Sequence, residues 1–313
     1  MNAARILITP RSVTQHGHPA LDRLRAAGFT TIIGPAGRQP TEAELLALLP
    51  GCVGYLAGVE PVTDRVLGVA KELKVISRNG VGIDNVDLPA ARRLGIAVLR
   101  AEGANSRGVA ELTLGLILAL ARAVPAADSS LKTGAWTRRE GIELAGRTLG
   151  LLGCGRIGQT MAQFALALGM RVVAHDPFAS ASFAPGPGFS WGDRQQVWRE
   201  SDVLSLHCPP EPGGRPLLDA PTLAIMKRGV LIVNTARFDH LDRDAVLAAL
   251  ISGQVGGLAL DVFAEEPPTD PSLIRHPRVI ATPHIGGYTR ESVDRAMALA
   301  VDNLLSVLSP ARS

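Results

Sequence analysis

The first hundred residues alternate short apolar runs with amphipathic segments. The apolar runs at 5–9, 30–33, 52–56, 74–77 and 96–99 have the length and composition of strands, and helical patterns separate them. Within one of these patterns, Thr41 is placed to cap a helix that Pro50-Gly51 ends. Strands that alternate with helices form a parallel sheet covered on both faces. Because no glycine-rich turn follows the first strand, we expect a flavodoxin-like domain here and not a nucleotide site.

The longest helical pattern covers Asn105–Ala123. Apolar residues form one stripe along it and line much of its remaining surface, which indicates burial on more than one side. Its longest apolar stretch, Leu112–Ala121, is too short to span a bilayer. We interpret the segment as a buried helix that crosses between domains or enters a subunit interface.

A second alternation of strands and helices occupies the rest of the chain. The predicted strands are 149–152, 171–175, 203–207, 230–234, 257–261 and 279–282, and the predicted helices are 159–169, 193–200, 220–227, 242–251 and 289–308. The run 230–234 is almost continuously apolar, as is typical of a strand buried on both faces of a parallel sheet. The fold class predicted for the chain is therefore α/β, with two doubly wound parallel sheets.

A glycine motif, Gly153-Cys154-Gly155-Arg156-Ile157-Gly158, lies between the first of these strands and its helix. In such a turn Gly153 permits the tight bend, Gly155 leaves room for a pyrophosphate, and Gly158 lets helix and strand pack closely. The helix N-terminus presents N–H groups to the phosphates. Asp176 ends the second strand, where a carboxylate bonds ribose hydroxyls and repels a 2′-phosphate. The pattern predicts a Rossmann domain that binds NAD rather than NADP.

Composition and charge are those of an ordinary globular protein, with 46% hydrophobic and 19% charged residues. The net charge is +3 and no basic block is present, so we expect neither a nucleic-acid partner nor a membrane partner. The three cysteines, Cys52, Cys154 and Cys208, are far apart, which favours a reducing compartment and no structural metal site. Since the first residues also lack a basic-then-apolar signal, we expect a cytoplasmic protein.

Three polar residues follow predicted strand ends of the second domain, where such a sheet places its ligand. They are Arg237, Glu266 and His284. A guanidinium can grip a carboxylate and polarise the adjacent carbonyl, and a histidine carries protons near neutral pH. A carboxylate beside the histidine favours the imidazolium and fixes its orientation. From the residues alone, Arg237 could instead form a surface ion pair, Glu266 could lie in a solvated turn, and His284 could stand at the start of a helix.

The segment Arg78–Asn85 is a glycine-bracketed loop after the fourth strand of the first domain. Its backbone N–H groups could hold a carboxylate, but the residues alone favour a tight strand-to-helix turn. His207, also at a strand end, is interpreted as a structural residue and not as the proton carrier.

Taken together, these blocks resemble the D-isomer-specific 2-hydroxyacid dehydrogenases, most closely their phosphoglycerate-dehydrogenase-like branch, over nearly the whole length. The matching blocks are Asn79–Asn85, Asn105 with Val109-Ala110-Glu111, Gly153–Gly158, Leu206–Pro209, Asn234–Arg237, Asp261-Val262-Phe263 with Glu266-Pro267, and Thr282–Gly287. Their order along the chain is the order found in the family, which is a far more specific signal than any single block.

The resemblance implies roles for these residues. Arg237, Glu266 and His284 would be the catalytic residues, and the backbone of Val81 and Gly82 would bind the substrate carboxylate. The NAD site would be lined by Gly153, Gly155, Arg156, Ile157, Gly158, Asp176, His207, Cys208, Pro209, Thr235, Ala236, Asp261, Gly286 and Gly287. The resemblance further implies a substrate domain at 1–100, a Rossmann domain at 101–286 inserted into it, and a helix at 287–313 that returns to the first domain. The Asn105–Ala123 helix would form a homodimer.

Two departures from the family bear on the substrate. Phe238-Asp239-His240 follows Arg237, where the family usually has glycine, and this affects the expected substrate size rather than the chemistry. The loop Leu56–Val59 has no basic residue that could meet a phosphate, which argues against 3-phosphoglycerate. The hypothesis is thus hydride transfer between NAD and a small D-2-hydroxy acid or 2-keto acid. The alternatives are a corepressor-like, non-catalytic NAD(H)-sensing scaffold and a reductant-specific relative such as a phosphonate-type dehydrogenase.

Overall fold

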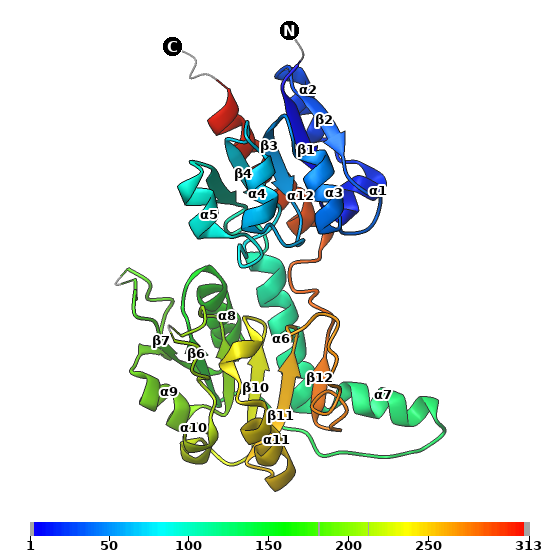
Figure 1. The fold of residues 1–313 in the computed structure, drawn as a ribbon. Coiled ribbons are helices and arrows are strands. Elements are labelled where there is room, and N and C mark those ends of the chain that lie inside the picture. The colour runs from blue at the N-terminus through cyan, green and yellow to red at the C-terminus, as the bar shows by residue number, and fades with distance from the viewer. Residues whose placement is uncertain (1–2, 181, 212, 310–313) are drawn as a thin grey trace. The chain divides into compact units, whose positions relative to one another are not determined.

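The computed structural model describes residues 3–180, 182–211 and 213–309. The chain forms two compact units (Figure 1). Unit 1 takes in the chain up to Asn105 and again from Arg290 onward, and unit 2 is Ser106–Thr289. The substrate-domain and NAD-domain roles expected for these parts of the chain stay predictions.

Unit 1 is built on a five-stranded sheet in the order β2-β1-β3-β4-β5. Its strands are β1 (Arg5–Ile8), β2 (Thr30–Ile33), β3 (Cys52–Ala57), β4 (Val75–Arg78) and β5 (Ala97–Arg100). Its helices are α1 (Arg11–His16), α2 (Leu21–Ala26), α3 (Glu42–Leu48), α4 (Asp64–Val69), α5 (Leu88–Arg93) and α12 (Arg290–Leu308). All four pairings are parallel, and this strand order is that of flavodoxin-like folds.

The two faces of this sheet are covered by different segments. One face packs its apolar side chains against α3, α4 and α5, and Thr41 caps α3 in a capping box with Glu44. The other face packs against α2 and α12 (Figure 1). The α12 side chains that it buries are Met297, Ala300, Val301 and Leu304. The last helix of the described chain is thus part of the core of the first unit.

Unit 2 contains a seven-stranded sheet in the order β12-β11-β10-β9-β6-β7-β8. Its strands are β6 (Thr148–Leu152), β7 (Arg171–His175), β8 (Phe189–Trp191), β9 (Val203–Leu206), β10 (Val230–Asn234), β11 (Val255–Leu260) and β12 (Val279–Ala281). Its helices are α6 (Ser106–Arg122), α7 (Val124–Lys132), α8 (Arg156–Ala167), α9 (Arg194–Glu200), α10 (Ala220–Ile225), the 3-10 turn η1 (Phe238–His240) and α11 (Arg243–Ser252). Every pairing is parallel, and the order is that of a Rossmann sheet. The predicted fold class, two doubly wound parallel sheets, is confirmed.

Helices α6 and α7 differ sharply in burial. Helix α6 buries seven residues and packs against α8 and the sheet of unit 2, whereas α7 buries none and projects from the rest of the unit (Figure 1).

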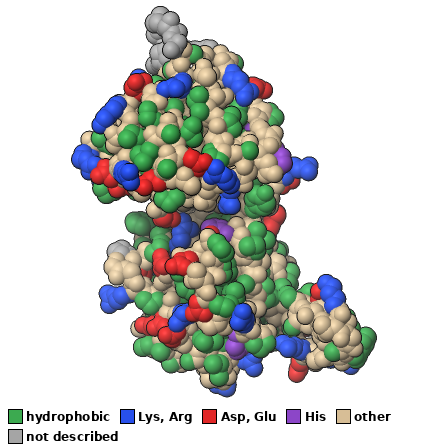
Figure 2. Space-filling view, turned by 45° about the vertical axis from the view of Figure 1, so that its right-hand side comes forward, with side chains coloured by type: hydrophobic (Ala, Val, Ile, Leu, Met, Phe, Trp, Pro, Cys, Tyr) green, Lys and Arg blue, Asp and Glu red, His purple; other side chains and the backbone are tan. Residues whose placement is uncertain are grey.

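In the described residues no single helix is long and apolar enough to cross a membrane, although α6 and α7, bent by 64°, pass that test of length and composition as a pair. On the face drawn in Figure 2, basic and acidic side chains are interspersed.

Three short elements were not predicted from the pattern. Helix α1 follows Pro10 and buries only two residues, so its apolar periodicity is short. Strand β8 has three residues and no fully buried position, and its Phe189 and Trp191 rings pack edge to face 5.2 Å apart. The turn η1 is a single turn in the Phe238–His240 departure.

Candidate functional site

The glycine turn after β6 brings two backbone segments close together. Gly153 has a φ of +88°, and a Cβ placed there would lie 2.5 Å from the carbonyl carbon of His207. The His207 N–H donates to the Leu152 carbonyl at 2.7 Å. Glycine is therefore required at position 153 both for the left-handed backbone and for the approach of the turn after β9.

The two following glycines have different surroundings. A Cβ at Gly158 would lie 2.3 Å from the Gly153 carbonyl oxygen, so this glycine permits the packing of α8 against the turn. A Cβ at Gly155 would meet no atom within 4 Å. Gly155 is the N-cap of α8 and supplies no side-chain cap. The first N–H groups of α8, with exposed Arg156 beside them, are thus arranged as an anion site is at a helix N-terminus.

Asp176, at the end of β7, is bound to the glycine turn. Its Oδ2 accepts from the Cys154 N–H at 2.7 Å, and its Oδ1 accepts from the Phe178 N–H at 2.8 Å. The carboxylate thereby joins the glycine turn after β6 to the backbone that follows β7. The predicted contact between Asp176 and a ribose stays a prediction.

The turn after β9 carries the predicted NAD-lining residues His207, Cys208 and Pro209. The Nε2 atom of His207 lies 2.9 Å from the Ser205 hydroxyl. Burial lowers the pKa of His207 to about 3, so its imidazole is neutral near pH 7 and does not donate a proton as an imidazolium there. Its Nδ1 is buried and has no partner among the described residues.

The turn after β10 carries Arg237 and is held by Asn234, a residue of a matching block for which the sequence predicted no role. Asn234 is fully buried, and its side chain accepts from the Ala236 N–H at 3.0 Å and donates to the Arg237 carbonyl at 2.7 Å. Thr235 lies 3.1 Å, hydroxyl to hydroxyl, from Thr113 of α6. Arg237 itself donates from Nη1 to the Ala236 carbonyl at 2.7 Å. A polar residue that ends an otherwise apolar strand was the available signal for Asn234.

His240, in η1, joins this turn to the turn after β9. The side chain of His240 is buried, and its Nε2 lies 2.9 Å from the Cys208 carbonyl oxygen. Burial lowers the pKa of His240, so the neutral ring donates this hydrogen bond.

Within the described residues, no group of three or more His, Cys, Asp or Glu could hold a metal ion.

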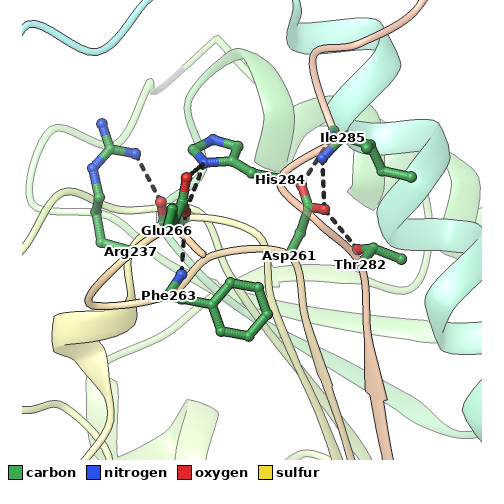
Figure 3. Close-up of polar contacts among 9 residues, drawn as sticks. Arg237, Asp261, Phe263, Glu266, Thr282, His284 and Ile285 are labelled. Atoms are coloured by element: carbon green, nitrogen blue, oxygen red, sulfur yellow. Dashed lines mark hydrogen bonds and ion pairs between the residues drawn. The ribbon is translucent and has the colours of Figure 1, made fainter. Parts of the chain in front are cut away.

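Glu266 and His284 form a direct pair (Figure 3). The Nδ1 atom of His284 lies 2.8 Å from each carboxylate oxygen of Glu266. The Phe263 N–H donates to Glu266 Oε1 at 3.3 Å. The side chains of His284 and Glu266 are 51% and 40% exposed, so a solute can reach the pair. The two residues that were expected to work together from separate loops are in contact.

Asp261 fixes the loop that carries His284 (Figure 3). It is 1% exposed, and its Oδ1 accepts from the Thr282 hydroxyl at 2.6 Å and from the Ile285 N–H at 2.8 Å. Its Oδ2 accepts from the Gly286 N–H at 2.7 Å. His284 adopts a left-handed φ of +53°, which is uncommon for a residue with a side chain. Asp261 therefore maintains the loop around His284, while its predicted role in lining an NAD site stays a prediction, as it does for Gly287.

Val81 and Gly82 lie in unit 1, in the loop after β4. The loop is anchored by the Asn79 N–H, which donates to the Ala57 carbonyl at 2.9 Å, and by the Gly80 carbonyl, which accepts from the Ala101 N–H at 2.9 Å. Both residues are half-buried. Their expected part in binding a carboxylate stays a prediction.

Comparison with known proteins gives this geometry a context. The profile of the family described as "D-isomer specific 2-hydroxyacid dehydrogenase, NAD binding domain" matches residues 114–286. A D-3-phosphoglycerate dehydrogenase of Sus scrofa is 43% identical over 82% of this chain and 48% of its own length. A hydroxypyruvate reductase of Thermotoga maritima is 40% identical over 85% of this chain and 88% of its own. The crystal structure of the TT0316 protein from Thermus thermophilus superposes with a TM-score of 0.87 at 40% identity, covering 97% of this chain and 96% of that one. The chain spans about half the length of the D-3-phosphoglycerate dehydrogenases of Sus scrofa and Rattus norvegicus that it matches.

Proposed function

The chain belongs to the D-isomer specific 2-hydroxyacid dehydrogenase family, and we propose that it transfers hydride between NAD and a small D-2-hydroxy acid or 2-keto acid. The observation that carries the proposal is the contact of His284 with Glu266 at 2.8 Å. A histidine oriented by a carboxylate and open to solutes is the proton carrier that such a reaction needs.

The residues of the glycine turn fit the cofactor of this family. The uncapped N-terminus of α8 and the open space beside Gly155 suit a pyrophosphate, and the Asp176 carboxylate suits an unphosphorylated ribose. When bound, NAD supplies or accepts the hydride. His207–Pro209, Thr235-Ala236 and Gly286-Gly287 are the further residues that we assign to this site.

The protein residues supply proton transfer and orientation. With Nδ1 turned to Glu266, His284 presents Nε2 to the substrate. In oxidation neutral His284 takes the hydroxyl proton, and in reduction the imidazolium returns it to the carbonyl oxygen. We assign to the Arg237 guanidinium the substrate carboxylate and the polarisation of the reacting carbonyl. The N–H groups of Val81 and Gly82 are the proposed additional ligands of that carboxylate.

The proposed substrate is a small keto acid without a phosphate. In unit 1 the loop after β3 presents Val59, 46% exposed, and Leu56–Val59 contains no cation. Two of the similar proteins are named for 3-phosphoglycerate and hydroxypyruvate, which are both three-carbon acids. We therefore favour the unphosphorylated acid of this size.

We also propose a cytoplasmic homodimer. The apolar side chains available for an interface lie mainly beyond the predicted Asn105–Ala123 helix, because α6 buries much of its apolar surface inside unit 2. Val124 and Leu131 of α7 are 54% and 56% exposed, and Trp136 is 83% exposed. The mass of the purified protein in solution, measured by sedimentation, tests this assembly.

The test of the function is NADH consumption with hydroxypyruvate, glyoxylate, pyruvate and phosphohydroxypyruvate. Wild-type protein should reduce at least one unphosphorylated acid, and NADPH should serve poorly. His284→Ala should lower kcat at least about 100-fold while the Kd for NADH is unchanged, because the proton carrier is lost and the glycine turn is intact. His16→Ala, which removes an exposed histidine of α1, is the matched control. Tight NADH binding without turnover of any acid would show a non-catalytic NAD(H)-binding protein instead.

A further inference from the structure

A buried carboxylate lies at the ends of the unit 1 strands and takes no part in the chemistry described above. Glu60 is 1% exposed. Its Oε1 accepts from the Tyr55 hydroxyl, from the Thr9 hydroxyl and from the Gly58 N–H, the last at 2.9 Å. We call Thr9, Tyr55, Gly58 and Glu60 the Glu60 cluster. Thr9 follows β1 and Gly58 follows β3, so the cluster joins two strand ends at the point where the strand order reverses.

The Glu60 carboxylate lies so close to Gly58 that the cluster requires glycine at this position. A Cβ at Gly58 would lie 2.6 Å from Glu60 Oε2, so a side chain at position 58 would displace the carboxylate. Oε2 is buried and has no hydrogen-bond partner among the described residues. Burial and the neighbouring Glu60 raise the pKa of Tyr55 well above its ordinary value, so Tyr55 stays a hydroxyl donor. A buried ionisable group with one unpartnered oxygen is costly to retain, which sets this residue apart from an ordinary core position.

Asn85 connects this cluster to the loop that contains Val81 and Gly82. Its Nδ2 donates to the Glu60 carbonyl at 2.7 Å, and its backbone carbonyl accepts from the Val62 N–H at 2.7 Å. Its Oδ1 accepts from Arg78 Nε at 3.1 Å. Arg78, 8% exposed, also donates from Nη1 to the Asn79 carbonyl at 3.2 Å. Arg78 and Asn85 therefore hold the two ends of the Asn79–Asn85 loop, and Asn85 joins it to the segment that Glu60 fixes.

We propose that Glu60 is a positioning residue for substrate binding: through Gly58, its own backbone and Asn85, it fixes the Asn79–Asn85 loop. The substrate ligands concerned are the N–H groups of Val81 and Gly82, so the kinetic part of this inference rests on the proposed function. A loop fixed in advance binds a small anion without first having to be ordered. Glu60 is too buried to touch substrate itself, and its effect falls on substrate affinity rather than on hydride or proton transfer.

Hydrogen exchange of the free protein tests the inference without reference to activity. In Glu60→Ala three donors lose their acceptor, and peptides covering 79–85 should exchange about tenfold faster or more than in wild type. Glu60→Gln keeps one oxygen for the same donors and should restore slow exchange to within about threefold. Glu72→Gln, which changes an exposed carboxylate of the same unit, is the matched control and should leave exchange unchanged. Unchanged exchange at 79–85 in folded Glu60→Ala overturns the inference.

Steady-state kinetics give the second readout. Glu60→Ala should raise the KM for the keto acid about tenfold, with kcat and the Kd for NADH within about twofold of wild type. A fall in kcat at constant KM contradicts a positioning role. If Glu60→Ala does not fold, Tyr55→Phe removes one donor at nearly constant volume, and it should speed exchange at 79–85 about threefold; unchanged exchange there overturns the inference. If Glu60→Ala exchanges faster at 79–85 but wild-type protein turns over no acid, only the proposed function is refuted. If wild-type protein turns over an acid but Glu60→Ala changes neither the exchange nor the KM, only the role of Glu60 is refuted.

Discussion

Asp261→Asn tests whether the loop around His284 is maintained by a single buried carboxylate. The wild-type side chain accepts from the Ile285 and Gly286 N–H groups and from the Thr282 hydroxyl at 2.6–2.8 Å. An asparagine has one accepting oxygen, and its NH2 group must face one of the two backbone donors. Whichever way the amide is turned, one backbone N–H loses its acceptor, either the buried one of Gly286 or the part-buried one of Ile285.

The magnitude follows from these contacts. A buried donor without a partner costs about 1–3 kcal/mol, and the bonds that remain lose the strength that the negative charge gave them. We expect the free energy of unfolding of unit 2 to fall by about 2–4 kcal/mol. Because His284 lies between two residues that Asp261 holds, kcat should fall about 10- to 100-fold, as reacting groups displaced by about 1 Å lose rate on that scale.

Tryptophan fluorescence in urea measures the stability of unit 2, the unit that contains Asp261. All three tryptophans, at 136, 191 and 198, belong to unit 2, so the transition reports that unit. Asp128→Asn, in exposed α7, removes the partner of Lys132 and should change the unfolding free energy by less than about 1 kcal/mol. An Asp261→Asn protein that matches wild type in both urea midpoint and kcat would refute the assigned role of Asp261.

Two further predictions concern the glycine turn and pH. Gly158→Ala places a Cβ 2.3 Å from the Gly153 carbonyl oxygen and should lower the free energy of unfolding by about 1–3 kcal/mol, measured by urea unfolding. Gly155→Ala meets no protein atom within 4 Å and should weaken only NADH binding, by about tenfold, measured by fluorescence titration. An equal loss of stability in the two variants would contradict this distinction. Burial lowers the pKa of His207 from 6.5 to about 3, so below pH 6.5 the unfolded chain binds a proton that the folded chain does not. Stability should therefore fall as the pH falls through this window, by about 3 kcal/mol at pH 4.5. His207→Asn should flatten that dependence, and an unchanged slope would show that this imidazole is not the group responsible.

The sheets and the strand-end residues were within reach of the sequence for a physical reason. Parallel strands are buried on both faces, so β6, β9 and β10 appear as apolar runs, and their ends mark the edge where ligands bind. Position in this pattern marked Arg237, Glu266 and His284 as candidates, and the resemblance to the family supplied their catalytic roles, which stay predictions. The Gly153–Gly158 turn was predicted from its spacing, and its close approach to the backbone at His207 is a property of three-dimensional packing.

The contacts that hold these residues in place could not be predicted from the sequence. Asp261 was expected to line a cofactor site, and nothing in its spacing showed that both its oxygens accept from the loop 282–286. His240 and Cys208 are 32 residues apart, and Glu60 and Thr9 are 51 apart. Such pairs are set by the folding of irregular loops, which carry no periodicity. Helix α1 was missed for a related reason, because only Val13 and Thr14 are buried and two adjacent positions show no helical period.

The position of α12 has a consequence for how the chain is made. The α12 side chains Met297, Ala300, Val301 and Leu304 cover a sheet face formed by residues such as Ile6, Leu56 and Val75. During synthesis the ribosome must complete Ser106–Thr289 before α12 emerges, which takes roughly 10 to 40 s at 5–20 residues per second. For that time the nascent unit 1 exposes an apolar sheet face. Unit 2 is continuous in sequence and can complete its own core first, so the part of the protein that is translated first is the last to finish folding.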